Sequence, residues 1–279
     1  MISKDKWDEL CATVTEEMTS HVKRFAVPLT MSEEHGSGVA WGSGTYISLG
    51  RDTWILTADH VLSDVPQGGR IAHLPKDGGD YNAAFGKPEA AAWPVDAAAL
   101  PIYPATEFLP DASRVTSSIA ETYSPVDEEL LFFFGFPGYT VERNDPRQKD
   151  KLIVSRFNHL TVPGKPMLSQ AIGPEVNLTA SNFDPTAHVA VHYPFAAQRA
   201  KDGAVVPLPN AAGMSGSALW DTKFVDCVNK GLVWNPEYAE ICGVVWAVLD
   251  NPEVIFATKI EQVRAGLPDV FLGYDGPGA

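Results

Sequence analysis

The sequence has only three cysteines among its 279 residues: Cys11, Cys227 and Cys242. Because this count is odd and sparse, it predicts buried free thiols rather than a disulfide framework, with a Cys227–Cys242 bridge as the alternative. Lysine and arginine are also few, 21 against 35 aspartates and glutamates, which gives a formal net charge of −14. An acidic surface repels phosphate backbones and anionic lipids, so neither a nucleic-acid nor a membrane partner is expected.

Long apolar runs are absent as well. No segment approaches the roughly 18 apolar residues of a membrane helix. The first residues, MISKDKWDEL, lack the apolar core of a secretory signal. These absences predict a cytoplasmic protein. The histidines form no HExxH pattern and stand beside no paired cysteines, so no metal site and no cofactor are expected.

Glycine and proline are plentiful, with 23 and 22 residues, and they separate short apolar or alternating runs such as GVAWGSGTYISL and ELLFFFGFP. Such runs between turn residues are typical of β-strands, and the scarcity of helical spacing between them argues against parallel βαβ units. Residues 5–22 do have helical spacing, and residues 258–267 resemble a short closing helix. The pattern predicts an all-β fold, mostly antiparallel and built as barrels or a sandwich, with a helix at each end.

Three short segments supply the residues of a nucleophilic site. LTADH carries His60, VDAAAL carries Asp96 as a lone charge, and GMSGSAL carries Ser215. A serine hydroxyl needs a base to take its proton, and a histidine base needs a buried carboxylate to fix its tautomer. Asp77 and Asp80 also follow the histidine, but they lie in PKDGGD, a glycine-rich turn that should be exposed to solvent. Asp96, with apolar flanks, is the predicted acid.

The glycines beside Ser215 favour the same chemistry. Gly213 and Gly216 let the backbone turn its N–H groups toward one point, and the anion formed at an attacked carbonyl needs such donors. The N–H groups of Gly213 and Ser215 are therefore the predicted oxyanion hole. An α/β-hydrolase elbow is excluded, because it needs G-x-S-x-G and a later histidine, whereas residue 217 is serine and the last histidine is His192.

LTADH, VDAAAL and GMSGSAL, in that order, resemble the histidine, aspartate and serine motifs of the trypsin/chymotrypsin-like serine peptidases, in particular the bacterial trypsin-like branch. GSGTYI, FFFGFPG and GVVWAV resemble further landmarks, so the resemblance covers about residues 36–250. It implies two antiparallel β-barrels of chymotrypsin type, with the active site between them and a protein or peptide as substrate. GVVWAV would then place Val245, Trp246 and Ala247 along the substrate.

This resemblance divides the chain into five parts. We expect an N-terminal helical extension at 1–24, a first barrel with His60 and Asp96 at 25–110, a connection at 111–125, a second barrel with Ser215 at 126–257, and a C-terminal helix and tail at 258–279.

Two residues depart from the family's pattern. Asp59 stands where a small residue is usual, and it either raises the basicity of His60 or points to solvent. Met214 replaces an aspartate that pairs with a new N-terminus after zymogen cleavage in the digestive enzymes, and no IVGG-like activation site is present. The resemblance thus implies a serine endopeptidase that forms an acyl-enzyme without trypsin-type zymogen activation.

By the same resemblance, the segment PLPNAAG before the serine would lie at the base of the substrate pocket, and it carries no acid. The resemblance therefore disfavours cleavage after arginine or lysine and favours a neutral or small residue. His192 either reaches the pocket that would hold the substrate side chain at the cleaved bond, or it faces elsewhere on its strand, as strand histidines more often do.

Two other functions stay open. One is a non-catalytic module of the same fold that binds peptides. The other is a protease subunit of a larger bacterial stress or defence system. The latter depends on the N-terminal helix, as the surface for a partner protein, and on the charged segment 141–151.

Overall fold

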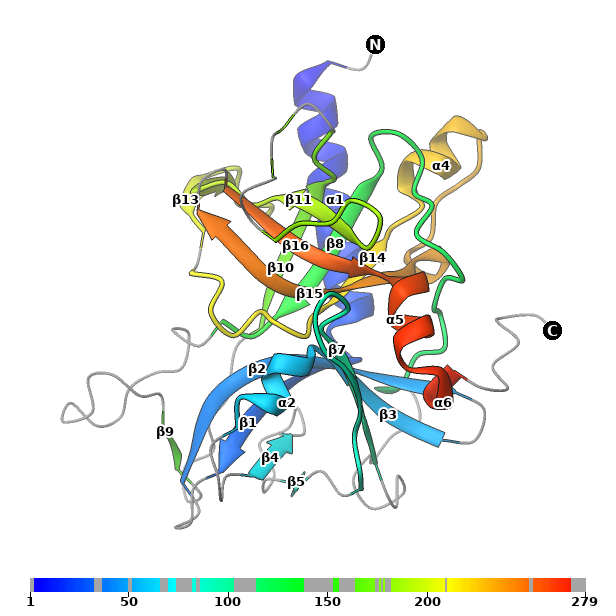
Figure 1. The fold of residues 1–279 in the computed structure, drawn as a ribbon. Helices are drawn as coiled ribbons and strands as arrows, with labels where there is room; N and C mark the ends of the chain where they lie inside the picture. The colour runs from blue at the N-terminus through cyan, green and yellow to red at the C-terminus, as the bar shows by residue number, and fades with distance from the viewer. Residues whose placement is uncertain are drawn as a thin grey trace.

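The computed structural model describes residues 3–32, 37–49, 52–65, 70–73, 82–83, 86–102, 114–137, 153–155, 164–173, 176, 178, 182–208, 210–250 and 253–271. Its strands form two large sheets and one hairpin, and every pair of strands is antiparallel. Figure 1 shows the first sheet at one end of the molecule and the second at the other. The predicted all-β fold of two antiparallel barrels with a helix at each end is confirmed.

The first sheet has the strand order β5-β4-β1-β2-β3-β7-β6. Its strands are β1 (Ala26–Ser32), β2 (Ser37–Leu49), β3 (Asp52–Thr57), β4 (Arg70–His73), β5 (Asn82–Ala83), β6 (Glu89–Ala91) and β7 (Ala97–Pro101). A later segment, β9 (Ile153–Ser155), also pairs with the beginning of β2. The short helix α2 (Asp59–Ser63) follows β3 almost directly, which places its first turn at the end of a central strand.

The second sheet has the order β10-β8-β14-β15-β16-β11. Its strands are β8 (Leu130–Gly135), β10 (Lys165–Gln170), β11 (His188–His192), β14 (Ala218–Asp221), β15 (Glu240–Asp250) and β16 (Glu253–Lys259). The two outermost strands meet where Ala171 bridges Val191 and the Ile172 N–H donates to the Ala190 carbonyl at 2.8 Å, which closes the sheet into a barrel. The hairpin of β12 (Ala196–Gln198) and β13 (Val205–Pro207) precedes the Ser215 turn.

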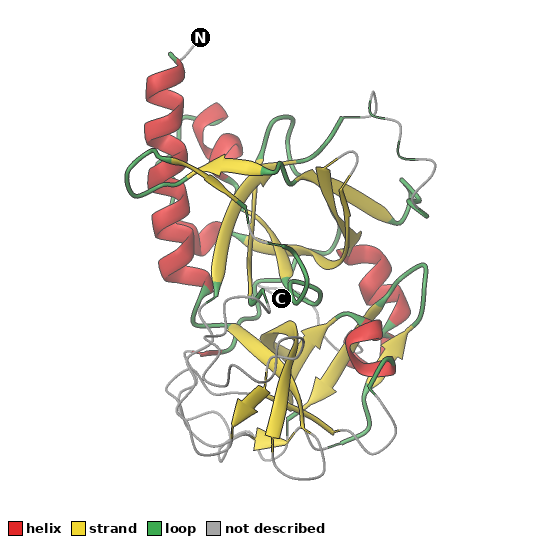
Figure 2. Ribbon diagram, turned by 90° about the vertical axis from the view of Figure 1, so that its left-hand side faces the viewer, coloured by secondary structure: helices red, strands yellow, loops and turns green. Residues whose placement is uncertain are grey.

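The N-terminal helix α1 (Lys4–Val22) runs alongside the second sheet, as Figures 1 and 2 show. Val14, Met18 and Val22 are buried at its apolar face, and they belong to one hydrophobic cluster that includes Ile47 of the first sheet and Trp220 of the second. Each such burial contributes about 1.5–3 kcal/mol. The helix is therefore part of a core that both sheets share. None of the described helices is long and apolar enough to cross a membrane.

The C-terminal helices α5 (Ile260–Gly266) and α6 (Pro268–Phe271) lie between the two sheets at one side of the molecule (Figure 1). The helix predicted at 258–267 begins two residues later than expected. Thr258 and Lys259 remain in β16 because they still pair with Val244 and Gly243 of β15. At its other end α5 contacts the first sheet, since a Cβ at Gly266 would lie 2.9 Å from that of Ala91.

The predicted free thiols are confirmed: Cys11, Cys227 and Cys242 form no disulfide. Cys242 is buried, and burial holds the pKa of its thiol well above the ordinary value. Burial likewise raises the pKa of the Cys11 thiol, to about 11. Both thiols are therefore protonated at neutral pH, which makes them poor nucleophiles.

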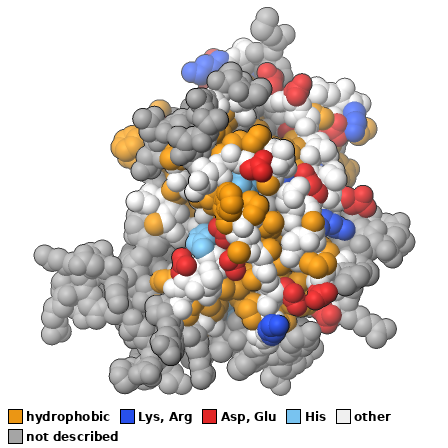
Figure 3. Space-filling model, in the orientation of Figure 1, with side chains coloured by type: hydrophobic (Ala, Val, Ile, Leu, Met, Phe, Trp, Pro, Cys, Tyr) orange, Lys and Arg blue, Asp and Glu red, His pale blue; other side chains and the backbone are white. Residues whose placement is uncertain are grey.

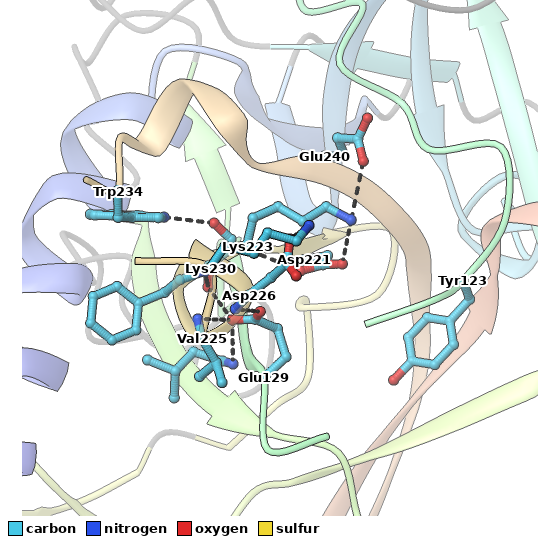
Figure 4. Close-up of polar contacts among 12 residues, drawn as sticks. Tyr123, Glu129, Asp221, Lys223, Val225, Asp226, Lys230, Trp234 and Glu240 are labelled. Carbon is cyan, nitrogen blue, oxygen red and sulfur yellow. Dashed lines mark hydrogen bonds and ion pairs between the residues drawn. The ribbon is translucent and has the colours of Figure 1, made fainter. Parts of the chain in front are cut away.

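Helix α4 (Phe224–Asn229) follows β14, and the 3₁₀ turn η3 (Pro236–Tyr238) lies beyond it. The buried carboxylate of Glu129, just before β8, accepts the Val225 and Asp226 N–H groups at 2.9 and 3.0 Å, as Figure 4 shows. It thereby supplies the cap that Lys223, the residue before α4, does not. This carboxylate fixes the start of β8 against the first turn of α4, just after β14.

Replacing Glu129 by glutamine is expected to lower the free energy of unfolding by about 1–3 kcal/mol, because an amide N–H₂ would then face one of these N–H donors. Urea denaturation measures the loss. The neighbouring Glu128 is exposed and is the matched control: Glu128→Gln should change stability by less than about 0.5 kcal/mol. Equal losses in the two variants would contradict the capping role.

Candidate active site

The predicted base and acid meet at adjacent strands of the first sheet. His60 lies in the first turn of α2, after β3, and Asp96 directly precedes β7, the strand paired with β3. His60 Nδ1 lies 2.8 Å from Asp96 Oδ2, and the His60 backbone N–H donates to Asp96 Oδ1 at 3.0 Å. The carboxylate therefore fixes both the ring and the helix that carries it, and it leaves Nε2 free to act as a base.

The hydrogen bond to Asp96 raises the pKa of His60, although burial opposes it, and the charges of Asp64 and Asp59 add to the rise. Burial and the charge of Asp96 in turn raise the pKa of Asp59. Of the two roles predicted for Asp59, support for the basicity of His60 agrees with this arrangement. The His60 side chain is 35% exposed and that of Asp96 12%, so the base is open to a substrate while the acid is mostly covered.

Ser215 lies in a tight turn before β14, against the first sheet. Gly213 and Gly216 have φ angles of +94° and +87°, which side chains rarely adopt. Gly216 also has no space, because a Cβ there would lie 2.1 Å from the Ser43 carbonyl oxygen and 2.1 Å from Thr57 Oγ1. The glycine at 216 is thus required by both the backbone and its neighbours.

Ser43 of β2 holds this turn from the first sheet. Its N–H donates to the Ser215 carbonyl at 2.8 Å, and its Oγ donates to the Gly213 carbonyl at 2.7 Å. The Phe136 N–H donates to the same Oγ at 2.9 Å. The N–H groups of Gly213 and Ser215, by contrast, have no hydrogen-bond partner among the described residues. Within those ranges, the two predicted oxyanion donors are thus unpaired.

The Ser215 hydroxyl donates to the Trp246 carbonyl at 3.3 Å, and the structure contains no Ser215–His60 hydrogen bond. The two residues are nevertheless near each other. A Cβ at Gly42 would lie 3.4 Å from the Ser215 carbonyl oxygen and 2.8 Å from Cγ1 of Val61, the residue after His60. The structure brings the acid and base together and leaves the hydroxyl turned toward β15. Nucleophile contacts of this kind often tighten only when substrate is bound.

The three predicted substrate-binding residues lie in β15 beside the nucleophile turn. The Gly216 N–H donates to the Val245 carbonyl at 2.7 Å. The register of β15 on β16 shifts between Val245 and Ala247, so Trp246 is a bulged residue. On its other edge, β15 pairs with β14 only as far as Val244, and no strand of the described ranges continues that edge. An extended peptide could add there as a strand.

Met214 anchors the turn from the other side. Its side chain is 1% exposed and lies in a cluster with Phe133, Leu219 and Val245 inside the second barrel. Apolar packing therefore occupies the place that the motif resemblance gives to the aspartate of the digestive enzymes. No charged partner is needed to seat this side chain.

His192 is not brought to the nucleophile. It is exposed at the end of β11, and it lines a cavity with Tyr123, Glu128 and Gln170 that contains neither Ser215 nor the residues against it. Of the two placements considered for His192, the structure has the second: the side chain faces away from the nucleophile turn. Asp77, Asp80 and the charged segment 141–151 lie outside the described residues.

The supporting residues around the nucleophile turn were missed from sequence. Ser43 stands in the GSGTYI segment, where the small residues indicated only a glycine-rich strand. A small polar residue in the centre of a buried strand was the one available signal for it. Within the described ranges, no three or more His, Cys, Asp or Glu side chains are grouped so that they could hold a metal ion.

Gly216→Ala is expected to destabilise the protein by about 3–5 kcal/mol, the sum of left-handed backbone strain and overpacking. Chemical denaturation measures the difference from wild type. Gly231 is a matched control, because its φ is +66° but a Cβ there meets nothing within 4 Å. Gly231→Ala should therefore cost only about 1 kcal/mol. If both substitutions cost the same, the close approach of Ser43 and Thr57 does not constrain the turn.

No family model matches the sequence, and no curated protein matches it either. Solved structures do match the fold. The serine endoprotease from Yersinia pestis is 14% identical with a TM-score of 0.52, and the match covers 93% of this chain and 67% of that one. The HtrA-type protease AlgW, solved with a tripeptide, is 13% identical with a TM-score of 0.53, over 93% of this chain and 64% of that one.

A third match is an inactivated enzyme. The scabies mite inactivated protease paralogue S-I1 is 13% identical with a TM-score of 0.53, and the match covers 90% of this chain and 96% of that one. The chain therefore has the fold of the trypsin-like serine proteases, as its motifs indicated. The fold is shared by proteases and by an inactivated relative, so it does not by itself decide activity.

Proposed function

We propose that this protein is a serine endopeptidase in which Ser215 is the nucleophile, His60 the general base and Asp96 the residue that orients His60. The observation that carries the proposal is the two-point contact of Asp96 with His60, at 2.8 and 3.0 Å, beside the strained turn of Ser215. An acid that holds both the ring and the backbone of a half-open histidine is suited to proton transfer.

The reaction would begin when the Ser215 hydroxyl rotates from the Trp246 carbonyl toward His60 Nε2. His60 takes the proton while Oγ attacks the scissile carbonyl, and the N–H groups of Gly213 and Ser215 stabilise the oxyanion. His60 then protonates the leaving amine, which leaves an acyl-enzyme on Ser215. Water, deprotonated by His60, releases the acid product and restores the hydroxyl.

The substrate is proposed to be an extended peptide that lies along β15 at Val245, Trp246 and Ala247. It would pair with the edge of the strand beyond Val245, because both backbone groups of Val245 are bonded to the nucleophile turn. The tripeptide in the AlgW structure supports a peptide as the ligand of this fold. Figure 3 shows hydrophobic side chains gathered in the middle of the face drawn there, with acidic side chains around them and few basic ones. Together with the alanines at 211 and 212, this favours a neutral or small residue at the cleaved bond.

The absence of trypsin-type zymogen activation is part of the same proposal. The buried packing of Met214 supports it, because the turn is seated without an ion pair to a new N-terminus. A partner protein at α1 is also proposed. One face of that helix is in the core, and its exposed residues include Glu9, Glu16 and Glu17.

Labelling with a fluorophosphonate probe tests the enzyme function, because the probe reacts only with an activated serine. Wild type should be labelled, and peptide mapping should place the label on Ser215. Ser217→Ala, which changes the other serine of the same turn, should keep the label. A peptide library would then give the residue preference. An unlabelled wild-type protein that also cleaves no library peptide would refute this function.

The second candidate is a non-catalytic module that binds peptides in the same place. It is favoured by the Ser215–Trp246 hydrogen bond, which turns the hydroxyl away from His60, and by the existence of an inactivated protease with this fold. Calorimetric binding of library peptides without turnover or probe labelling would select this function over the first.

A further inference from the structure

The turn of residues 92–96 carries the proposed catalytic acid in a strained conformation. Asp96 has a φ of +42°, and the internal support of the turn consists of the Val95 and Asp96 N–H groups donating to the Ala92 carbonyl at 3.1 and 3.4 Å. A residue other than glycine in this region costs about 1–3 kcal/mol and persists only where its surroundings hold it. The support for Asp96 must therefore come from outside the turn.

Two side chains of the second sheet provide that support. His188 Nε2 donates to the Pro94 carbonyl at 2.6 Å, and Thr258 Oγ1 donates to the Val95 carbonyl at 2.6 Å. His188 of β11 and Thr258 of β16 stand directly opposite each other in the register of these strands. One cross-strand pair of the second barrel thus binds two consecutive carbonyls in the loop that ends at Asp96.

His188 is itself rigidly placed. The Asp184 N–H donates to its Nδ1 at 3.0 Å, which leaves the proton on Nε2 for the Pro94 carbonyl. The side chain is 1% exposed, and its ring centroid lies 5.0 Å from that of Trp246. The Trp246 carbonyl accepts the Ser215 hydroxyl, so His188 contacts both the loop of the acid and the strand beside the nucleophile.

We propose that His188 is a positioning residue, which holds the 92–96 turn from the second barrel so that Asp96 keeps both of its contacts with His60. Thr258 acts with it. The consequence for catalysis rests on the proposed peptidase function. The structural link from His188 through Asp96 to His60 does not depend on that function. It can therefore be measured even if the protein hydrolyses no peptide.

NMR titration of the His60 ring tests the link directly. In His188→Leu, which keeps the bulk but lacks the donor, the pKa of His60 should fall from its raised position toward the ordinary value. Asp59, Asp64 and Asp96, the carboxylates that act on His60, are all still present in this variant. His188→Gln carries an N–H₂ that can reach the Pro94 carbonyl, so it should restore most of the shift.

Kinetics provide the second measurement. His188→Leu should lower kcat by about 10- to 100-fold, as expected for misplacement of a catalytic group, with little change in KM. His73→Leu is the matched control, because His73 is equally buried and bonds the Tyr46 hydroxyl at 2.7 Å in the first barrel. It should cost stability but leave the pKa of His60 where it is in wild type.

The outcomes separate the two proposals. If His188→Leu leaves the pKa of His60 unchanged, or shifts it no more than His73→Leu does, the positioning role is wrong. If His188→Leu does not fold, Thr258→Val decides, since it is nearly isosteric and removes only the hydrogen bond to Val95. An unchanged pKa in that variant would overturn the role. A lowered pKa of His60 in the variant, together with a wild-type protein that is not labelled by the probe and cleaves no library peptide, would support positioning and refute the peptidase.

Discussion

Ser215→Ala is expected to lower kcat for peptide hydrolysis by about 10⁶-fold, to the level left by binding and the oxyanion donors alone. The loss is this large because serine, histidine and aspartate act as a unit in the proposed mechanism, so removal of the nucleophile would end acyl-enzyme formation. Steady-state hydrolysis of the best library peptide measures it. Substrate binding should survive, which also makes this variant a trap for natural substrates.

The matched control for this substitution is in the same turn. Within the described ranges, the Ser215 hydroxyl makes one hydrogen bond, at 3.3 Å to the Trp246 carbonyl, so its loss should hardly change the melting temperature. Ser217 is fully buried and donates to the Met214 carbonyl at 2.7 Å. Ser217→Ala should therefore cost about 1–2 kcal/mol of stability while keeping most of the activity. If Ser217→Ala lost the activity and Ser215→Ala kept it, the assignment of Ser215 as the nucleophile would be wrong.

Asp96→Asn is expected to lower kcat by about 10⁴-fold, because an amide holds the imidazole in the wrong tautomer and does not stabilise the imidazolium. The pH profile should move as well. The Asp96 hydrogen bond raises the pKa of His60, and His60 is active as a base only when neutral. In wild type the rate therefore rises with pH through this raised pKa. In Asp96→Asn, the remaining rate should still rise with pH, but the rise should occur at lower pH values than in wild type.

The dependence of kcat/KM on pH measures this shift, and NMR titration of His60 confirms its origin. Asp64→Asn is the control, since Asp64 acts on His60 only through its charge and makes no hydrogen bond to the ring. It should change kcat by less than about threefold. A pH profile that moves equally in both variants would show that the Asp96 hydrogen bond is not what sets the basicity of His60.

Much of the fold, and the contact between the candidate acid and the candidate base, could be predicted from sequence. The helix expected at 5–22 is observed at Lys4–Val22, because its apolar spacing is long and regular. The acid predicted for its apolar flanks, Asp96, is the one in contact with His60. Both the helix and this contact follow from local patterns of sequence, which record burial reliably, whereas the catalytic role of Asp96 stays a prediction.

What could not be predicted depends on register between distant segments. The contact of His188 with Pro94 spans 94 positions and that of Thr258 with Val95 spans 163, and neither residue has a local pattern that indicates it. The start of α5 was misplaced for the same reason, since strand pairing at Thr258 overrides helical spacing. The direction of the Ser215 hydroxyl is a choice among side-chain rotamers, which sequence does not encode.

The hydrogen bond from Ser43 to Gly213 joins residues 170 positions apart. During synthesis, the strand that carries Ser43 leaves the ribosome long before the turn that it holds. A nascent chain with its first barrel complete contains His60 and Asp96 but no nucleophile, and a fragment with the second barrel alone contains a turn without its support. The order of translation therefore delays assembly of the site until most of the chain has been made, so any activity of the proposed peptidase would appear only after both barrels are present.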